Sequence, residues 1–167
     1  LADSQFFAAL AIDIMDRNLY ERANDCRWWA LDSTIRRLLA DSSDKGQREG
    51  LQKVIAYINR LYTVYDNILV FDTAGKVMAV ANPNYAGLVG KPLSEPWVRD
   101  CLNLGDSQSY TVSGFERSPL YAMRPTYVYL AALRAPNDSR VIGGIAIVLQ
   151  PGKDAWGIEF EPRKVMD

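Results

Sequence analysis

The chain has 167 residues, of which 49% are hydrophobic and 23% are charged, so it is long enough to build one substantial core. Its formal net charge of −1 argues against the concentrated basic surface that nucleic-acid binding requires. It contains no histidine, which excludes Ser-His-Asp and Cys-His catalytic pairs, His-ligated haem and the common metal sites that contain histidine. We therefore expect neither an enzyme nor a metal or cofactor site.

A long helix is expected at the start of the chain, because apolar residues recur every three or four positions from about residue 4 to Leu31. Such a helix is about 40 Å long, so we expect it to run the length of the domain. Trp28 and Trp29 point about 100° apart, so one faces the core and the other a partner or a loop. The apolar stripe consists of Phe6, Phe7, Leu10, Ile14, Ala23, Cys26 and Ala30.

Two shorter helices follow. Residues 32–34 favour a break and restart, and Asp44 is placed to cap a third helix, with Gln47 at capping-box distance. Residues 1–65 are thus expected to be helical. The residues expected to be buried are Ile35, Leu38 and Leu39 in the second helix, and Leu51, Val54, Ile55, Ile58, Leu61 and Tyr62 in the third.

The second half of the chain shows strand patterns with one helical insert. Apolar runs at 67–72 and 77–81 flank Ala74-Gly75, which is a hairpin signal. A helix is expected over 93–102, with Ser94 as its cap and Pro96 in its first turn. Three more strands are expected at 108–115, 127–133 and 141–149. The predicted fold class is α+β, with a five-stranded antiparallel sheet, a long N-terminal helix and additional packing helices.

Two local features leave alternatives open. Gly143-Gly144 lies inside an apolar strand, which indicates either a bulge or helix contact, the favoured interpretation, or the close approach of a ligand. Cys26 and Cys101 could form a disulfide in an oxidising compartment. Because each lies on the apolar stripe of a helix, two buried free cysteines are favoured instead.

The order of these segments resembles a Cache domain over nearly the whole chain. The resemblance rests on residues 16–31, 68–77 and 109–113, on Glu95-Pro96-Trp97, and on 140–149. It implies a PAS-like sheet and a sensory role in bacterial chemoreceptors, sensor kinases or cyclic-di-GMP enzymes. The length implies a single-Cache domain over 1–167, with a helical stalk and helices at 1–65, a PAS-like sheet at 66–150 and a C-terminal extension at 151–167.

The resemblance also implies a ligand site between the sheet and residues 90–102, with Trp97 and Tyr110 as walls. Related double-Cache amino-acid sensors use an arginine two places before that tryptophan and an aspartate on the last strand. The corresponding positions here are Glu95 and Ala146. A simple carboxylate is therefore a more suitable ligand than a zwitterionic amino acid.

Strand residues supply further candidates for ligand binding. Arg124 is the expected anion anchor, because a guanidinium can bind a carboxylate in two places. The alternative is a surface arginine paired with Glu116 or another neighbour. Alternation along the strands places Tyr121, Met123, Tyr127 and Tyr129 on one parity, unless Pro125 resets the register. The expected ligand-binding residues are Trp97, Tyr110, Ser113, Arg124, Tyr127 and Tyr129, although cross-strand packing explains each tyrosine as well.

The leading functional hypothesis is a ligand-sensing receptor domain that signals through its long first helix. The alternatives are a ligand-free dimerisation or interaction domain and a cofactor-binding PAS-like module for haem or flavin. We expect a small-molecule ligand and a homodimer formed through the first helix. Because Leu1-Ala2-Asp3 opens directly in a helical pattern, we also expect a membrane-anchored full-length receptor with this part in the periplasm, cytoplasmic placement staying open.

Overall fold

The computed structural model describes residues 2–151, without the side chains of residues 2, 3, 11 and 14–19. Three helices come first, α1 (Ala2–Leu31), α2 (Ser33–Ala40) and α3 (Lys45–Leu61). The side chain of the predicted stripe residue Ile14 and all but the first residue of the predicted C-terminal extension lie outside the described part. The remaining elements are β1 (Tyr65–Asp72), β2 (Val77–Val80), η1 (Pro83–Leu88), α4 (Pro96–Leu102), β3 (Thr111–Val112), η2 (Pro119–Tyr121), β4 (Val128–Arg134) and β5 (Val141–Leu149).

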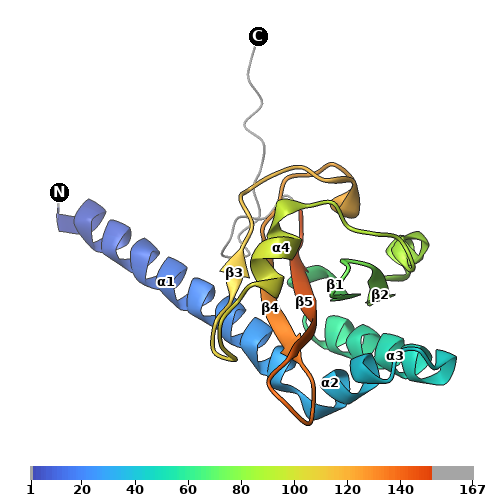
Figure 1. The fold of residues 1–167 in the computed structure, drawn as a ribbon. Helices are drawn as coiled ribbons and strands as arrows, with labels where there is room; N and C mark the ends of the chain where they lie inside the picture. The colour runs from blue at the N-terminus through green and yellow to red at the C-terminus, as the bar shows by residue number, and fades with distance from the viewer. Residues whose placement is uncertain (1, 152–167) are drawn as a thin grey trace.

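The strands form one antiparallel sheet in the order β2-β1-β5-β4-β3, which confirms the predicted fold class. Helices α1, α2 and α3 pack on one face and α4 packs on the other (Figure 1). Alternation along β5 serves both faces, because Ile145 and Ile147 belong to the core under α1–α3 while Ala146 and Val148 belong to the core under α4. The sheet thus separates two apolar layers.

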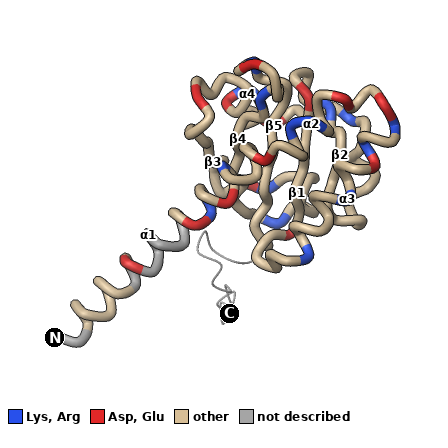
Figure 2. The backbone as a smooth tube through the Cα atoms, turned by 90° about the horizontal axis from the view of Figure 1, so that it is seen from below, with Lys and Arg blue, Asp and Glu red and all other residues tan. Residues whose placement is uncertain are grey.

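Helix α1 extends well beyond the sheet, which corrects the expectation that it runs only the length of the domain (Figures 1 and 2). Ala23, Cys26 and Ala30 are buried, whereas Phe6 and Phe7 are each 64% exposed. A 30-residue helix is about 45 Å long, and five strands span only about 20 Å. The sheet can therefore cover only the last part of α1.

The helix boundaries confirm one predicted cap and correct two others. Asp44 Oδ1 accepts a hydrogen bond from the Gly46 N–H at 2.7 Å, as a cap of α3 should. The capping box is not formed, because the Asp44 N–H donates to the Asp41 carbonyl instead. Glu95, rather than Ser94, occupies the N-cap position of α4, and its side chain makes no capping bond.

The buried faces of the helices largely follow the predicted stripes. Trp29 packs against the core beside Tyr62 and Tyr65, while Trp28 is 76% exposed. This confirms that the two tryptophans point in different directions. Ile35, Leu38, Leu39, Leu51 and Ile55 are buried as expected. Leu61 and Tyr62 at the end of α3 are exposed, because the helix ends there and the chain turns into β1.

Strand β3 has only two residues, where the pattern predicted a strand over 108–115. The Asp106 carboxylate holds a turn instead, accepting hydrogen bonds from the Gln108 N–H and the Ser109 hydroxyl. A turn closed by a side chain competes with the sheet for the same backbone groups. The chain enters the sheet only at Thr111, which pairs with Leu130.

Gly143 and Gly144 are required by packing against neighbouring elements, which supports the helix-contact interpretation. A Cβ on Gly143 would meet the Phe71 carbonyl oxygen and a Leu39 methyl group. On Gly144 it would lie 2.5 Å from the Phe71 ring and 2.7 Å from Cys101 Sγ. Cys26 and Cys101 are both free and buried, one on each side of the sheet, so no disulfide joins them.

No helix within residues 2–151 is long and apolar enough to span a bilayer.

Candidate functional site

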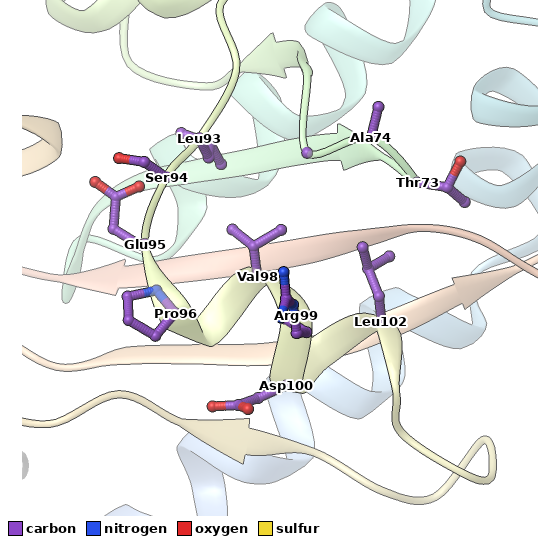
Figure 3. Close-up of a pocket in the computed structure, with 11 residues that line it drawn as sticks. Thr73, Ala74, Leu93, Ser94, Glu95, Pro96, Val98, Arg99, Asp100 and Leu102 are labelled. Carbon is purple, nitrogen blue, oxygen red and sulfur yellow. The ribbon is translucent and has the colours of Figure 1, made fainter.

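A cleft of about 440 Å³ lies between the β1–β2 turn and the segment that leads into α4 (Figure 3). It falls within the region where the sequence predicts ligand binding, between the sheet and residues 90–102. Apolar and polar side chains alternate around it, so the cleft offers both contact area and hydrogen-bonding groups. The lining residues are Thr73, Ala74, Gly75, Leu93, Ser94, Glu95, Pro96, Val98, Arg99, Asp100 and Leu102.

The β1–β2 turn is a stiff wall of this cleft. Asp72 Oδ1 accepts hydrogen bonds from the N–H groups of Ala74 and Lys76, both at 2.9 Å. Gly75 has φ 77°, a left-handed conformation that favours glycine. The Leu93 N–H donates to the Gly75 carbonyl at 2.8 Å, which ties the turn to the segment that enters α4.

The start of α4 brings the Glu95 carboxylate and the Arg99 guanidinium to the cleft. Figure 3 shows Arg99 and Leu102 projecting toward the β1–β2 turn, while Asp100 points away from it. Glu95 Oε1 accepts a hydrogen bond from the Ser118 hydroxyl at 3.2 Å, and its buried Oε2 has no partner within residues 2–151. The exposed Arg99 guanidinium can bind a carboxylate in two places, and Glu95 can accept a further hydrogen bond.

Trp97 points from α4 into the core and does not line the cleft. Its side chain is 5% exposed and packs on Phe71 at a ring distance of 6.5 Å. Burial of Cys101 beside it raises the pKa of that thiol to about 12, so the cysteine stays protonated at neutral pH. This part of α4 anchors the helix to the sheet.

The predicted tyrosines lie on the opposite face of the sheet from Trp97, which corrects the expectation that Trp97 and Tyr110 form two walls of one pocket. Tyr110 stacks on Tyr129 at 6.4 Å, and Arg27 of α1 lies 5.3 Å from the centre of the Tyr110 ring. Tyr129 belongs to the core under α1–α3, and Tyr127 packs against that core. Alternation shows which residues share a face, but it does not show which helix covers that face.

Burial sets the chemistry of these tyrosines. It is the main cause that raises the pKa of Tyr129 to about 12, with smaller effects from neighbouring groups.

Tyr121, which the sequence placed on the same parity as Tyr127 and Tyr129, instead lies in the core under α4. The parity is broken by η2 and by Ala122 and Met123, which both adopt left-handed φ angles near 57°.

Ser113 and Arg124 have protein partners. Ser113 Oγ accepts a hydrogen bond from the Val128 N–H and donates to the Gly114 carbonyl, so it completes the pairing of β3 with β4. Arg124 Nη2 donates to the Pro151 carbonyl at 2.9 Å, and no ion pair joins Arg124 to Glu116 within the described residues. Whether the six predicted residues contact a ligand stays a prediction.

Sequence analysis overlooked Arg99 and the β1–β2 turn as parts of a site. A signal was available, because Glu95 and Arg99 stand four positions apart at the start of the predicted helix and therefore share a face. The approach of the turn to that face is a tertiary contact with no local signature. Among the described residues, no group of three or more Cys, Asp or Glu side chains could hold a metal ion.

Solved structures with the same fold are sensor domains of bacterial signalling proteins. The V. cholerae histidine kinase DctB sensor domain matches with a TM-score of 0.65 and 13% identity, over 89% of this chain and 57% of that one. The E. coli DcuS sensor domain matches with a TM-score of 0.63 and 20% identity, over 82% of this chain and 91% of that one. These likenesses establish a PAS-like sensor fold.

A ligand-bound chemoreceptor domain shares the fold as well. The ligand-binding domain of a Campylobacter jejuni chemoreceptor, in complex with L-norvaline, matches with a TM-score of 0.59 and 15% identity. The match covers 89% of this chain and 61% of that one. The chain thus spans a little over half the length of the DctB and C. jejuni domains. No family model and no curated protein matches the sequence.

Proposed function

We propose that the chain is the ligand-sensing domain of a bacterial signal-transduction receptor, and that it binds a small organic carboxylate in the cleft between the β1–β2 turn and α4. The observation that carries the proposal is the cleft itself, because it places Arg99 beside apolar side chains on a sensor fold. A guanidinium at the rim of a partly apolar cleft suits a ligand with one carboxylate and a hydrocarbon body.

The proposed domain unit is the whole chain, 1–167, acting as one sensor module. The match to the DcuS sensor domain supports this, since 82% of this chain covers 91% of that domain. We place the module outside the cytoplasm, anchored to the membrane through segments beyond it.

A simple acid suits this site better than an amino acid. The position that corresponds to an ammonium-binding aspartate is Ala146, which is buried in the core under α4. The cleft contributes the cation Arg99 together with the carboxylates of Glu95 and Asp100, and Asp100 points away from the turn. Glu95 remains to accept a hydrogen bond from a hydroxyl or ammonium group of the ligand, so the preference for a simple acid rests on the missing aspartate.

The test is a thermal-shift screen against small carboxylates and amino acids, followed by calorimetric titration of each hit against two variants. Arg99→Ala should weaken binding by about tenfold or more, because it removes a charge-assisted contact. Arg124→Ala is the matched comparison, since Arg124 is the counter-charge expected from the sequence and lies outside the cleft.

Each outcome has a defined meaning. Loss of affinity in Arg99→Ala alone supports the cleft. Loss in Arg124→Ala alone moves the site to the neighbourhood of Pro151. A screen in which no compound raises the melting temperature contradicts ligand sensing and favours the second candidate, a ligand-free dimerisation domain, which the exposed Phe6 and Phe7 of α1 support.

A further inference from the structure

A second, smaller cavity lies where the end of α1 meets the ends of two strands. Its volume is about 210 Å³, about half that of the cleft beside α4. It is separate from the cleft beside α4, with which it shares no lining residue. The lining residues are Ala30, Leu31, Arg36, Ser107, Ala132, Arg134, Asp138 and Ser139.

Two half-buried arginines dominate the chemistry of this cavity. Arg36 of α2 donates from Nε to the Arg134 carbonyl at 2.8 Å and from Nη2 to the Ala135 carbonyl at 2.9 Å. Arg134 of β4 donates from Nη1 to the Ser139 carbonyl and from Nη2 to the Leu104 carbonyl. Backbone carbonyls therefore fix both guanidinium groups without neutralising their charge.

One buried donor nitrogen of this pair has no partner within the described residues. Arg134 Nε is buried and has no hydrogen-bond partner within residues 2–151. A buried N–H of a charged group without an acceptor is costly, and Arg134, which lines the cavity, can remove that cost by turning Nε toward an oxyanion there. The Ser107 hydroxyl lines the same cavity and can donate a further hydrogen bond.

The acidic groups around the cavity limit what it can hold. Asp138 also lines it, and Asp138 Oδ1 accepts a hydrogen bond from the Arg140 N–H. Hydrogen bonds from the Gln108 N–H and the Ser109 hydroxyl are the main causes that hold the pKa of the exposed Asp106 below its usual value. The Arg134 charge makes a smaller contribution in the same direction. Two guanidiniums against one lining carboxylate leave one net positive charge, which matches a monoanion better than a dianion.

We propose that this cavity is a second binding site, distinct from the cleft, for a small monocarboxylate. The carboxylate lies against Arg134 and Arg36, and a hydroxyl or ammonium group on the same molecule donates to Asp138. Because the cavity joins the end of α1, the start of α2, the α4–β3 segment and the β4–β5 loop, an occupant there also fixes the base of the stalk helix.

The experiment is a nuclear magnetic resonance titration of the Arg Nε–H signals of the whole chain, with acetate, glycine, inorganic phosphate and methylammonium as probes at constant ionic strength. Acetate and glycine should shift the Arg134 Nε–H signal saturably, and glycine should bind more tightly through Asp138. Phosphate should bind more weakly, and methylammonium should cause no saturable shift.

Arg134→Lys keeps the charge but removes the Nε–H, and it should weaken acetate binding roughly tenfold. Binding to this variant is measured through the Ser107 amide signal. Arg140→Lys is the matched control, because its exposed side chain does not line the cavity, and it should bind acetate as the unaltered chain does. An Arg134 signal that shifts no more than that of Arg140, or equal acetate affinity in both variants, overturns the proposal. Arg99→Ala should leave this titration unchanged, which separates the cavity from the cleft.

Discussion

Individual side chains control how closely α4 can approach the sheet. Gly144 lies on β5, and both the Phe71 ring and Cys101 of α4 lie within 3 Å of the position that a Cβ would take there. Neither neighbour can retreat, because both are fully buried. A single methyl group at this position must therefore separate α4 from the sheet or displace Phe71.

We expect Gly144→Ala to lower the free energy of unfolding by about 1–3 kcal/mol, the usual cost of overpacking a core. Gly87→Ala is the control, since a Cβ there meets nothing within 4 Å, and it should change stability by less than about 0.5 kcal/mol. Urea unfolding followed by tryptophan fluorescence measures both. Equal stability of the two variants would show that α4 can move away from the sheet freely.

Asp25 and Tyr65 form a polar contact between α1 and β1, in which the Tyr65 hydroxyl donates to Asp25 Oδ2 at 2.5 Å. Burial raises the pKa of the Asp25 carboxyl above 3.8, and the hydrogen bond from Tyr65 opposes that rise. The folded chain therefore binds more protons than the unfolded chain between 3.8 and the raised value. This contribution to stability is fully present below 3.8 and is lost as the pH rises through the raised pKa.

Asp25→Asn should remove this part of the pH dependence, so its free energy of unfolding should fall less between about pH 3.5 and pH 7 than that of the unaltered chain. Tyr65→Phe removes the opposing hydrogen bond and should make the fall larger. Urea unfolding across this pH range measures both. Parallel curves for the Asp25→Asn variant and the unaltered chain would refute the assignment.

At the scale of elements, β2 is an edge strand whose free backbone groups are capped. The Val77 N–H donates to the Lys91 carbonyl, and the Val77 carbonyl accepts from the Gly90 N–H. The Gln52 side chain of α3 bonds both the N–H and the carbonyl of Val80. Capping of this kind blocks pairing with the edge strand of another molecule.

Gln52→Ala should lower the free energy of unfolding by about 1–2 kcal/mol and increase aggregation on heating, because the Val80 backbone loses both partners. Lys53→Ala is the control on the same helix, since the exposed Lys53 side chain makes no hydrogen bond or ion pair within the described residues. Urea unfolding and light scattering give the two readouts. The idea fails if the two variants unfold and aggregate alike.

The elements also show how far sequence patterns extend. The continuous apolar run at 141–149 predicted β5 in full, because a strand buried on both faces needs no alternation. Strand β3 was overpredicted, because the hydrogen bonds of Asp106 carry no periodic signal. Trp97 and Tyr110 were assigned to one pocket, since the pattern of each element gives its faces but not the helix that covers them.

At the scale of the whole molecule, α1 presents an apolar surface that nothing in the described part covers. Phe6, Phe7, Leu10 and Ile12 are all exposed on the part of α1 that extends beyond the sheet. Of the stripe predicted from about residue 4 to Leu31, only Ala23, Cys26 and Ala30 are buried among the described side chains, so the expectation that it runs the length of the domain is wrong. Periodicity reveals a face that favours burial without revealing whether the partner is the same chain or a second copy.

We expect a monomer–dimer equilibrium through this surface in solution. The double variant Phe6→Glu and Leu10→Glu should weaken dimerisation by about tenfold or more, because it places charges in an apolar contact. Tyr57→Glu, which alters an exposed aromatic residue on α3, is the control and should leave the equilibrium unchanged. Sedimentation equilibrium measures all three, and a strictly monomeric chain at high concentration would contradict the prediction.

The central claim is that a small carboxylate binds between the β1–β2 turn and α4. Hydrogen–deuterium exchange of the chain, with and without the compound that gives the largest thermal shift, tests it most directly. The account predicts slower exchange at residues 73–75 and 93–102, with little change at residues 110–112 and 127–129 of the opposite face. Protection confined to the opposite face, or no protection anywhere, would contradict it.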